Sequence, residues 1–201
     1  MTLPDIKMTS EMLWLTALVT ALIDVGVILF LARRIQRPRF RQLHWPVAFA
    51  AGVFWVSYGL MLFALTWESF YAKFLPDPAN RSLACSMFEL LPYPIIGLVL
   101  WWLSVRLPGN PAVHFCLLGG VQSLPEHLWG IYRLGMMDKV PFLQEASVAS
   151  VLAFAVPEYI LYWGSILSIA MLIQSGSQWY RHYRVSRARK KAGQHELELT
   201  G

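Results

Sequence analysis

The sequence predicts an all-α polytopic membrane protein, a bundle of five transmembrane helices with the N-terminus outside or lumenal and the C-terminus cytoplasmic. Hydrophobic residues make up 56% of the 201 residues and charged residues only 14%, a balance far from that of soluble domains. Apolar runs long enough to cross a hydrocarbon layer of about 30 Å occur five times, at residues 12–32, 45–66, 83–105, 112–134 and 148–174.

The first run is expected to stay in the protein as a helix. It is about 20 residues long, the length that spans a bilayer, follows acidic residues as well as Lys7, and leads directly into Arg33 and Arg34. A cleaved signal peptide has a shorter apolar region and different flanks. Because the connections between runs are short, residues 1–178 are predicted to form one five-helix domain, followed by a basic cytoplasmic tail over 179–201.

The orientation follows from the basic residues. Twelve of the 17 Lys and Arg residues lie in the first and third connections or in the tail, and cytoplasmic segments accumulate such residues. The membrane would be the endoplasmic reticulum in a eukaryote or the inner membrane in a bacterium. We attribute the basic tail to orientation and to contact with anionic phospholipid. No nucleic-acid partner is expected, and a homodimer is left open.

Four carboxylates lie well inside the predicted spans: Asp24, Glu89, Glu126 and Glu158. Each costs about 2.5 to 3.5 kcal/mol on membrane-insertion scales, so buried ionisable residues of this kind indicate a functional site. The structural alternative is that they pair with one another or with tyrosines and hold the helices together.

The glutamates lie at similar depths. Glu89, Glu126 and Glu158 are six, eight and ten residues from the outer ends of their runs, which corresponds to about 9, 12 and 15 Å at the helical rise. Trp55 and Tyr58 of the second run fall near the same height. If the five helices form one bundle, these side chains are predicted to make one polar layer in its outer half.

Prolines mark the same layer. A proline inside a helix breaks a backbone hydrogen bond and bends the helix, which makes room for a ligand. On the fourth run Gln122 shares a face with Glu126, whereas His127 is turned about 100° away; it reaches a neighbouring helix or satisfies one hydrogen bond there. The prolines beside the three glutamates are Pro92, Pro94, Pro125 and Pro157.

Several chemistries are excluded or disfavoured. Glu126 and His127 are adjacent, not spaced as the Glu-x-x-His pair of a di-iron site, so no metal is expected. The spans contain no lysine for a Schiff base, and the chain has no nucleophile elbow or P-loop. Acid and base chemistry or cation binding remains. A protonated carboxyl would donate to an alkene while an ionised one stabilises the carbocation, and tryptophan faces would add cation–π attraction. No cofactor is needed.

Two segments resemble a known family. FELLPYPIIG (88–97) and VQSLPEHLWGIY (121–132) are similar to segments of the emopamil-binding, or EXPERA, superfamily, which includes the sterol Δ8-Δ7 isomerase and the sigma-2 receptor. The resemblance covers most of residues 12–174 and implies a five-span bundle. It also implies that Glu89 holds a cationic amine or a sterol carbocation and that Glu126 is the acid of the fourth helix. The second run departs from the family, because FWVSYGL (54–60) lacks its histidine and glutamate.

The expected activity is a cofactor-independent isomerase that moves a double bond, through a carbocation, in a sterol or isoprenoid-like lipid. The alternatives are a non-catalytic binder, chaperone or transporter of sterols, lipids or cationic amphiphiles, and a structural subunit of a membrane complex. The predicted catalytic residues are Glu89, Glu126, His127 and Glu158. The predicted ligand-binding residues are Asp24, Trp55, Tyr58, Gln122, Trp129 and Tyr159.

Overall fold

The computed structural model describes residues 8–36, 40, 42–62, 77, 80–81, 91–140 and 143–199. All of the longer elements in these residues are helices, which confirms the all-α prediction. The helices are α1 (Ser10–Ile35), α2 (His44–Leu62), α5 (Pro92–Ser104), α6 (Pro111–Leu134), α7 (Met136–Lys139) and α8 (Val148–Leu199).

Two of these helices are long and apolar enough to cross a membrane: α1 and the Val148–Arg187 part of α8. Helix α5 is apolar but shorter. Helix α6 matches the predicted run 112–134 to within one residue. Helices α2 and α5 cover most of 45–66 and the later part of 83–105, and the rest of those two runs lies outside the described residues.

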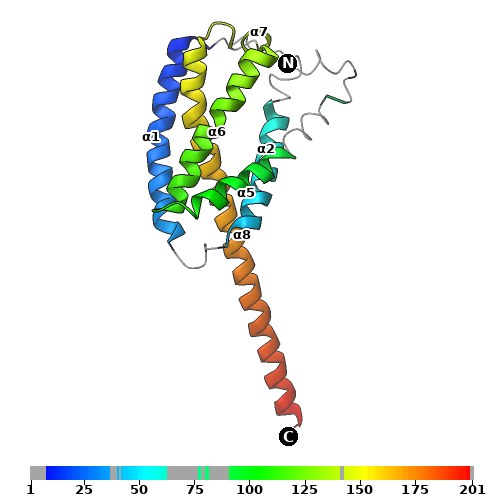
Figure 1. The fold of residues 1–201 in the computed structure, drawn as a ribbon. Helices are drawn as coiled ribbons and strands as arrows, with labels where there is room; N and C mark the ends of the chain where they lie inside the picture. The colour runs from blue at the N-terminus through cyan, green and yellow to red at the C-terminus, as the bar shows by residue number, and fades with distance from the viewer. Residues whose placement is uncertain are drawn as a thin grey trace.

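Helix α8 is the central element of the bundle. It contacts α1, α2 and α6, and α5 packs against α2 and α6. Beyond the bundle α8 continues as a single helix to Leu199 (Figure 1). The fifth predicted span and residues 179–199 of the predicted basic tail therefore belong to one uninterrupted helix.

Helices α1 and α8 run parallel in a constant register. The backbone N–H of Ser147, just before α8, donates to Ser10 Oγ at 2.8 Å, a pair 137 residues apart. Further along, Val27 lies against Gly164, where an added Cβ would come within 2.8 Å of Val27 Cγ1. That pair has the same separation in sequence. Each α1 residue of this segment therefore lies level with the α8 residue 137 positions later.

Glycines bring α6 against α8. A Cβ on Gly119 would lie 2.1 Å from Trp163 Cδ1, and one on Gly120 would lie 2.6 Å from Ile160 Cγ1. No real side chain tolerates such distances, so only glycine permits this approach. Trp163, which is fully buried, occupies the space beside Gly119, and Ile160 occupies the space beside Gly120.

Both ends of α6 are capped. Asn110 Oδ1 accepts a hydrogen bond from the backbone N–H of Ala112 at 2.9 Å, and its Nδ2 donates to the carbonyl of Ala32 at 2.9 Å. The second bond ties the start of α6 to the last turn of α1. Gly135 ends the helix with φ +65°, a left-handed conformation that glycine adopts without strain.

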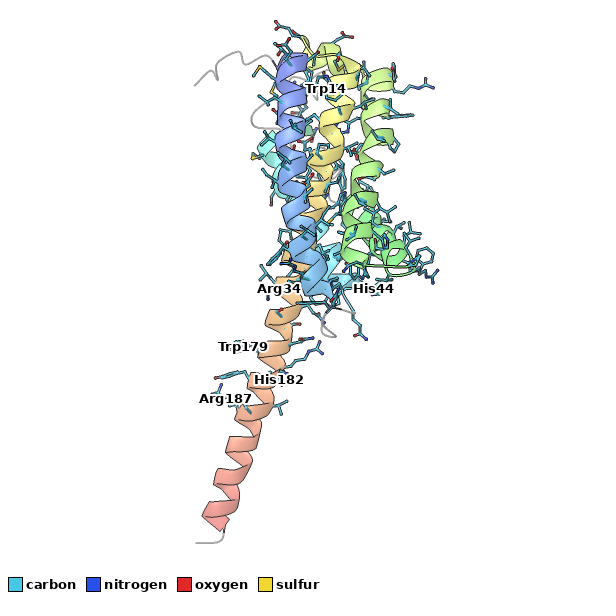
Figure 2. The ribbon with its side chains drawn as sticks, turned by 90° about the vertical axis from the view of Figure 1, so that its left-hand side faces the viewer. Trp14, Arg34, His44, Trp179, His182 and Arg187 are labelled. Carbon is cyan, nitrogen blue, oxygen red and sulfur yellow. The ribbon has the colours of Figure 1, made fainter. Side chains whose placement is uncertain are left out.

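The bundle has two buried apolar clusters. The larger contains Trp55, Trp101 and Trp163, and the smaller contains Leu13 and Val151, near the starts of α1 and α8. The two ends of the bundle also differ at the surface. Figure 2 shows Trp14 near one end and Arg34 and His44 at the other, with Trp179, His182 and Arg187 on the extension of α8.

Candidate functional site: a glutamate–tyrosine cluster

Glu126 of α6 is the most heavily bonded acidic side chain among the described residues. Its Oε1 accepts hydrogen bonds from the hydroxyl of Tyr93 on α5 and, at 2.6 Å, from the hydroxyl of Tyr159 on α8. Its Oε2 accepts from Gln122 Nε2, one turn earlier on α6, at 2.6 Å. Gln122 is held in turn, because its Oε1 accepts from Trp163 Nε1 at 3.3 Å. Three donors from three helices thus converge on one carboxyl group.

Glu158 of α8 has a second pair of tyrosines. Its Oε1 accepts hydrogen bonds from the hydroxyl of Tyr58 on α2 at 3.2 Å and from the hydroxyl of Tyr162, one turn later on α8. The two tyrosine oxygens are themselves 2.6 Å apart. Glu158 also lies near enough to Glu126 to interact with it electrostatically. We call the two carboxyls and their partners the glutamate–tyrosine cluster: Glu126, Glu158, Tyr58, Tyr93, Tyr159, Tyr162 and Gln122.

Trp55 joins the two halves of the cluster. Its ring stacks on Tyr93 with centroids 4.0 Å apart and planes at 14°. It also meets Tyr58 and Tyr162 edge to face, at 5.6 and 5.5 Å. Trp55 is 2% exposed, so its orientation is fixed by packing. The cluster therefore holds a closely packed group of aromatic rings beside two carboxyl groups.

His127 lies beside the cluster and reaches outside its own helix. Its ring meets Tyr159 edge to face at 5.4 Å, and it lies within electrostatic range of Glu158. Nδ1 is 2.9 Å from the carbonyl oxygen of Ser123, so a hydrogen on Nδ1 donates to that carbonyl. In the neutral ring Nε2 is then a free base.

The structure places seven of the ten predicted site residues in the cluster or directly against it: Trp55, Tyr58, Gln122, Glu126, His127, Glu158 and Tyr159. Glu89 lies outside the described residues. Trp129 is 61% exposed, with the Arg133 guanidinium 5.9 Å from its ring centroid, and does not join the cluster. Asp24 is buried on α1 and shares no hydrogen bond with the cluster.

Sequence reasoning missed two tyrosines that donate to the glutamates. Tyr162 follows Glu158 by four residues, the spacing that places two side chains on the same helix face, so periodicity could have identified it. Tyr93 lies between two prolines, four residues after Glu89. Its hydroxyl reaches Glu126 on α6 instead, a contact between helices that spacing alone does not predict.

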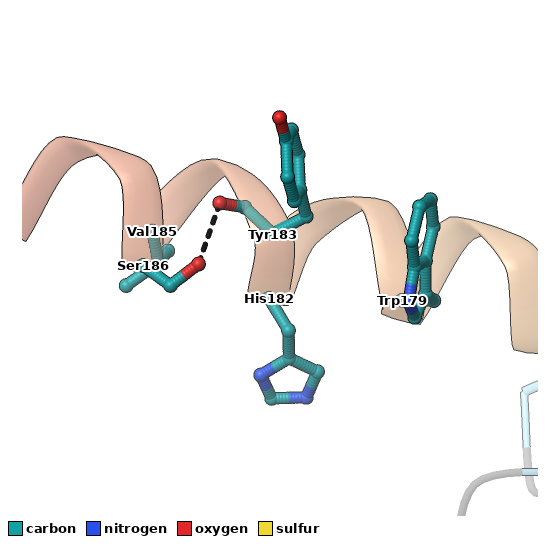
Figure 3. Close-up of a pocket in the computed structure, with 5 residues that line it drawn as sticks. All are labelled: Trp179, His182, Tyr183, Val185 and Ser186. Atoms are coloured by element: carbon teal, nitrogen blue, oxygen red, sulfur yellow. Dashed lines mark hydrogen bonds between the residues drawn. The ribbon is translucent and has the colours of Figure 1, made fainter.

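A surface hollow lies on the extension of α8, far along the helix from the cluster (Figure 3). Trp179 and Tyr183 stack there with centroids 5.8 Å apart, and Ser186 Oγ donates to the carbonyl of Tyr183 at 2.8 Å. The other lining residues are His182 and Val185. All five residues come from one helix, and none of them belongs to the cluster.

The described residues contain no group of three His, Cys, Asp or Glu side chains that could hold a metal ion. Comparisons of the chain with protein-family models, with curated proteins and with solved structures give no match. The function is therefore inferred from the chemistry of the glutamate–tyrosine cluster.

Proposed function

We propose that the chain is a polytopic membrane protein that resembles the EXPERA group. Its glutamate–tyrosine cluster would move a double bond in a sterol or isoprenoid-like lipid without a cofactor. The observation that carries the proposal is the meeting of two glutamates from two helices in one part-buried cluster, each held by two tyrosine hydroxyls. A double-bond shift gains one proton and loses another, so paired proton donors and acceptors supply all that it requires.

A membrane location is supported by the outer surface of the bundle. Large apolar side chains are exposed along the whole length of α1, and α5 and α6 add more, a pattern that marks contact with lipid or protein. In Figure 1, α1 and α8 run away from the end of the bundle that carries α7, and α6 runs toward that end, as expected for spans of opposite direction. The exposed apolar residues of α1 are Met12, Trp14, Leu15, Leu18, Val19, Leu22, Ile23, Val25, Leu29 and Phe30.

The topology is tested by single cysteines placed at the two ends of the bundle in a variant without Cys85 and Cys116. Gln144→Cys, between α7 and α8, should react with a membrane-impermeant thiol reagent in intact cells or vesicles. His44→Cys, at the start of α2, should react only after the membrane is opened. Equal reaction of both positions in sealed membranes would contradict the proposed multi-pass orientation.

The two carboxyls are suited to different roles. Glu126 accepts hydrogen bonds from three donors, and an ionised carboxylate can accept hydrogen bonds at both of its oxygens. Glu126 would therefore be the charged group that stabilises positive charge. Around Glu158, three oxygens lie within hydrogen-bond distance of one another, while the hydroxyls of Tyr58 and Tyr162 supply only two hydrogens. A proton on Glu158 supplies the third, so Glu158 would act as the acid.

The reaction follows from these roles. Glu158 gives its proton to one alkene carbon, and the neighbouring carbon becomes a cation. The carboxylate of Glu126 and the aromatic rings around it would stabilise that cation. His127 Nε2 removes a proton from the carbon on the other side, which leaves the double bond shifted by one position. His127 then returns the proton to Glu158. Glu89 keeps its expected role, stabilising positive charge.

The test is product formation by Glu158→Gln and Glu126→Gln variants in membranes with candidate sterol and isoprenoid substrates. Loss of a general acid typically lowers a rate by about 10²- to 10⁴-fold, so turnover should fall by that order while the thermal stability stays close to that of the wild type. The control is Glu11→Gln, an exposed acid in the first turn of α1. Unchanged turnover in both cluster variants would remove the catalytic proposal.

A non-catalytic binder of cationic amphiphiles or sterols is the second candidate. It is favoured by α2, which contributes Trp55 and Tyr58 but no carboxylate. A carboxylate beside stacked aromatic rings attracts an ammonium group whether or not a reaction follows. Thermal-shift titration with cationic amphiphiles, followed by analysis of the lipid that copurifies, separates the two candidates. Stabilisation that depends on Glu126, with every recovered lipid unaltered, would support the binder.

A further inference from the structure

Asp24 is the most isolated buried acid in the part of the chain that the structure describes. Its side chain is 3% exposed, and neither carboxyl oxygen has a hydrogen-bond partner there. Buried polar atoms in native proteins nearly always have a partner, so an orphaned one calls for an explanation such as a bound species. Glu126 and Glu158 differ sharply from Asp24, because tyrosine hydroxyls bind both of them.

Asp24 is buried near a close contact between apolar side chains of α1, α6 and α8. By the constant register of α1 and α8, Asp24 lies level with Leu161, beside the contact between Val27 and Gly164. An added Cβ on Gly164 would also lie 3.8 Å from Cys116 Sγ on α6. This is a junction of three helices, and no hydrogen-bonding group of the described residues reaches the Asp24 carboxyl.

The titratable groups near this junction are few. The titratable group on α6 is the thiol of Cys116, which is fully buried and lies within electrostatic range of Asp24. On α8, Glu158 and Tyr162 are the nearest in height, and they bond to each other and to Tyr58. None of these groups is a cation that could balance a charged Asp24.

The remaining candidate for a bound species is a proton. A metal ion would need further ligands, and the described residues offer no such group. An unpaired carboxylate in dry surroundings is so unfavourable that the group takes up a proton instead. We propose that Asp24 is a proton-binding site separate from the glutamate–tyrosine cluster, and that release of its proton loosens α1 from α6 and α8. This proposal does not depend on the proposed catalytic function.

The first test is infrared spectroscopy of the full-length protein in lipid nanodiscs at neutral pH. A protonated carboxyl gives a carbonyl stretch distinct from that of a carboxylate. Asp24→Asn should lose the part of this absorbance that Asp24 contributes and keep any part that comes from Glu158, whereas Glu11→Gln should keep all of it. Identical spectra for the wild type and Asp24→Asn in this region would overturn the proposal. If Asp24→Asn does not fold, Asp24→Leu provides the same comparison.

The second test uses Cys116 to report the loosening of α1. With Cys85 replaced by serine, the rate at which a membrane-permeant thiol reagent labels Cys116 is measured from mildly acidic to alkaline pH. Since thiols react faster as pH rises, each rate is divided by that of Asp24→Asn at the same pH. If opening requires loss of one proton, this ratio should rise about tenfold per pH unit while most of Asp24 is protonated, and level off once Asp24 is ionised. A ratio that is independent of pH would overturn the coupling.

Discussion

Gly119→Ala should open the interface that holds the glutamate–tyrosine cluster together. The new methyl group would lie 2.1 Å from Trp163 Cδ1 and 2.5 Å from its Cγ. Trp163 is fully buried and donates a hydrogen bond to Gln122, so its ring cannot move aside without losing that bond or displacing its neighbours. Overpacking of this kind costs about 1 to 3 kcal/mol, and the upper end applies here. The better helix propensity of alanine returns about 1 kcal/mol, which leaves a net loss of about 2 kcal/mol.

The assay is thermal unfolding of the purified protein in detergent, with Gly26→Ala as the matched control. Gly26 is also a helical glycine, on α1, but nothing lies within 4 Å of the position of its added Cβ. Gly26→Ala should therefore unfold at the wild-type temperature or slightly above it. Gly119→Ala should unfold several degrees lower and lose turnover or ligand binding. Equal unfolding temperatures for the two variants would refute the close approach of α6 and α8.

Three further substitutions test separate contacts by the same unfolding assay. Asn110→Ala removes the α6 cap and the bond to Ala32, and should cost about 1 to 2 kcal/mol; no change would mean that the cap is not formed. Tyr159→Phe removes one donor from Glu126 and should cost about 1 to 3 kcal/mol, with weaker ligand binding measured by titration. Arg106→Gln removes a guanidinium 3.7 Å from the Trp102 ring, and should cost only about 0.5 to 1 kcal/mol.

Helix α6 was predictable almost to the residue because local chemistry defines its ends. Asn110 followed by a proline begins the helix, and Gly135 ends it. The end of α8 was less predictable from hydropathy, since that pattern marks where the lipid-facing part stops and not where the helix stops. After Pro157 the chain contains no further proline, and isolated glycines such as Gly176 and Gly193 do not end the helix.

The positions of the site residues along the helix axes could be predicted from the sequence. The helix faces on which their side chains lie could not. Counting residues placed Glu126 and Glu158 in one layer, and the structure brings them together. The same count could not show that Asp24 lies at another junction or that Trp129 lies on the surface. Those positions depend on which face of α1 or α6 turns toward α8. Glycines 119 and 120 set that choice for α6, because they determine which face lies closest to Trp163.

The tyrosine contacts by themselves suit a structural role, because hydrogen bonds between helices hold a bundle together. A neutral glutamine would accept from Tyr93 and Tyr159 at lower cost than Glu126, since it carries no charge into a poorly solvated interior. Two carboxyls within electrostatic range of one another add a second cost, because like charges repel. The proposed function places one charge on Glu126 and one proton on Glu158. That state supplies both an acid and a stabiliser of positive charge, which a purely structural contact does not require.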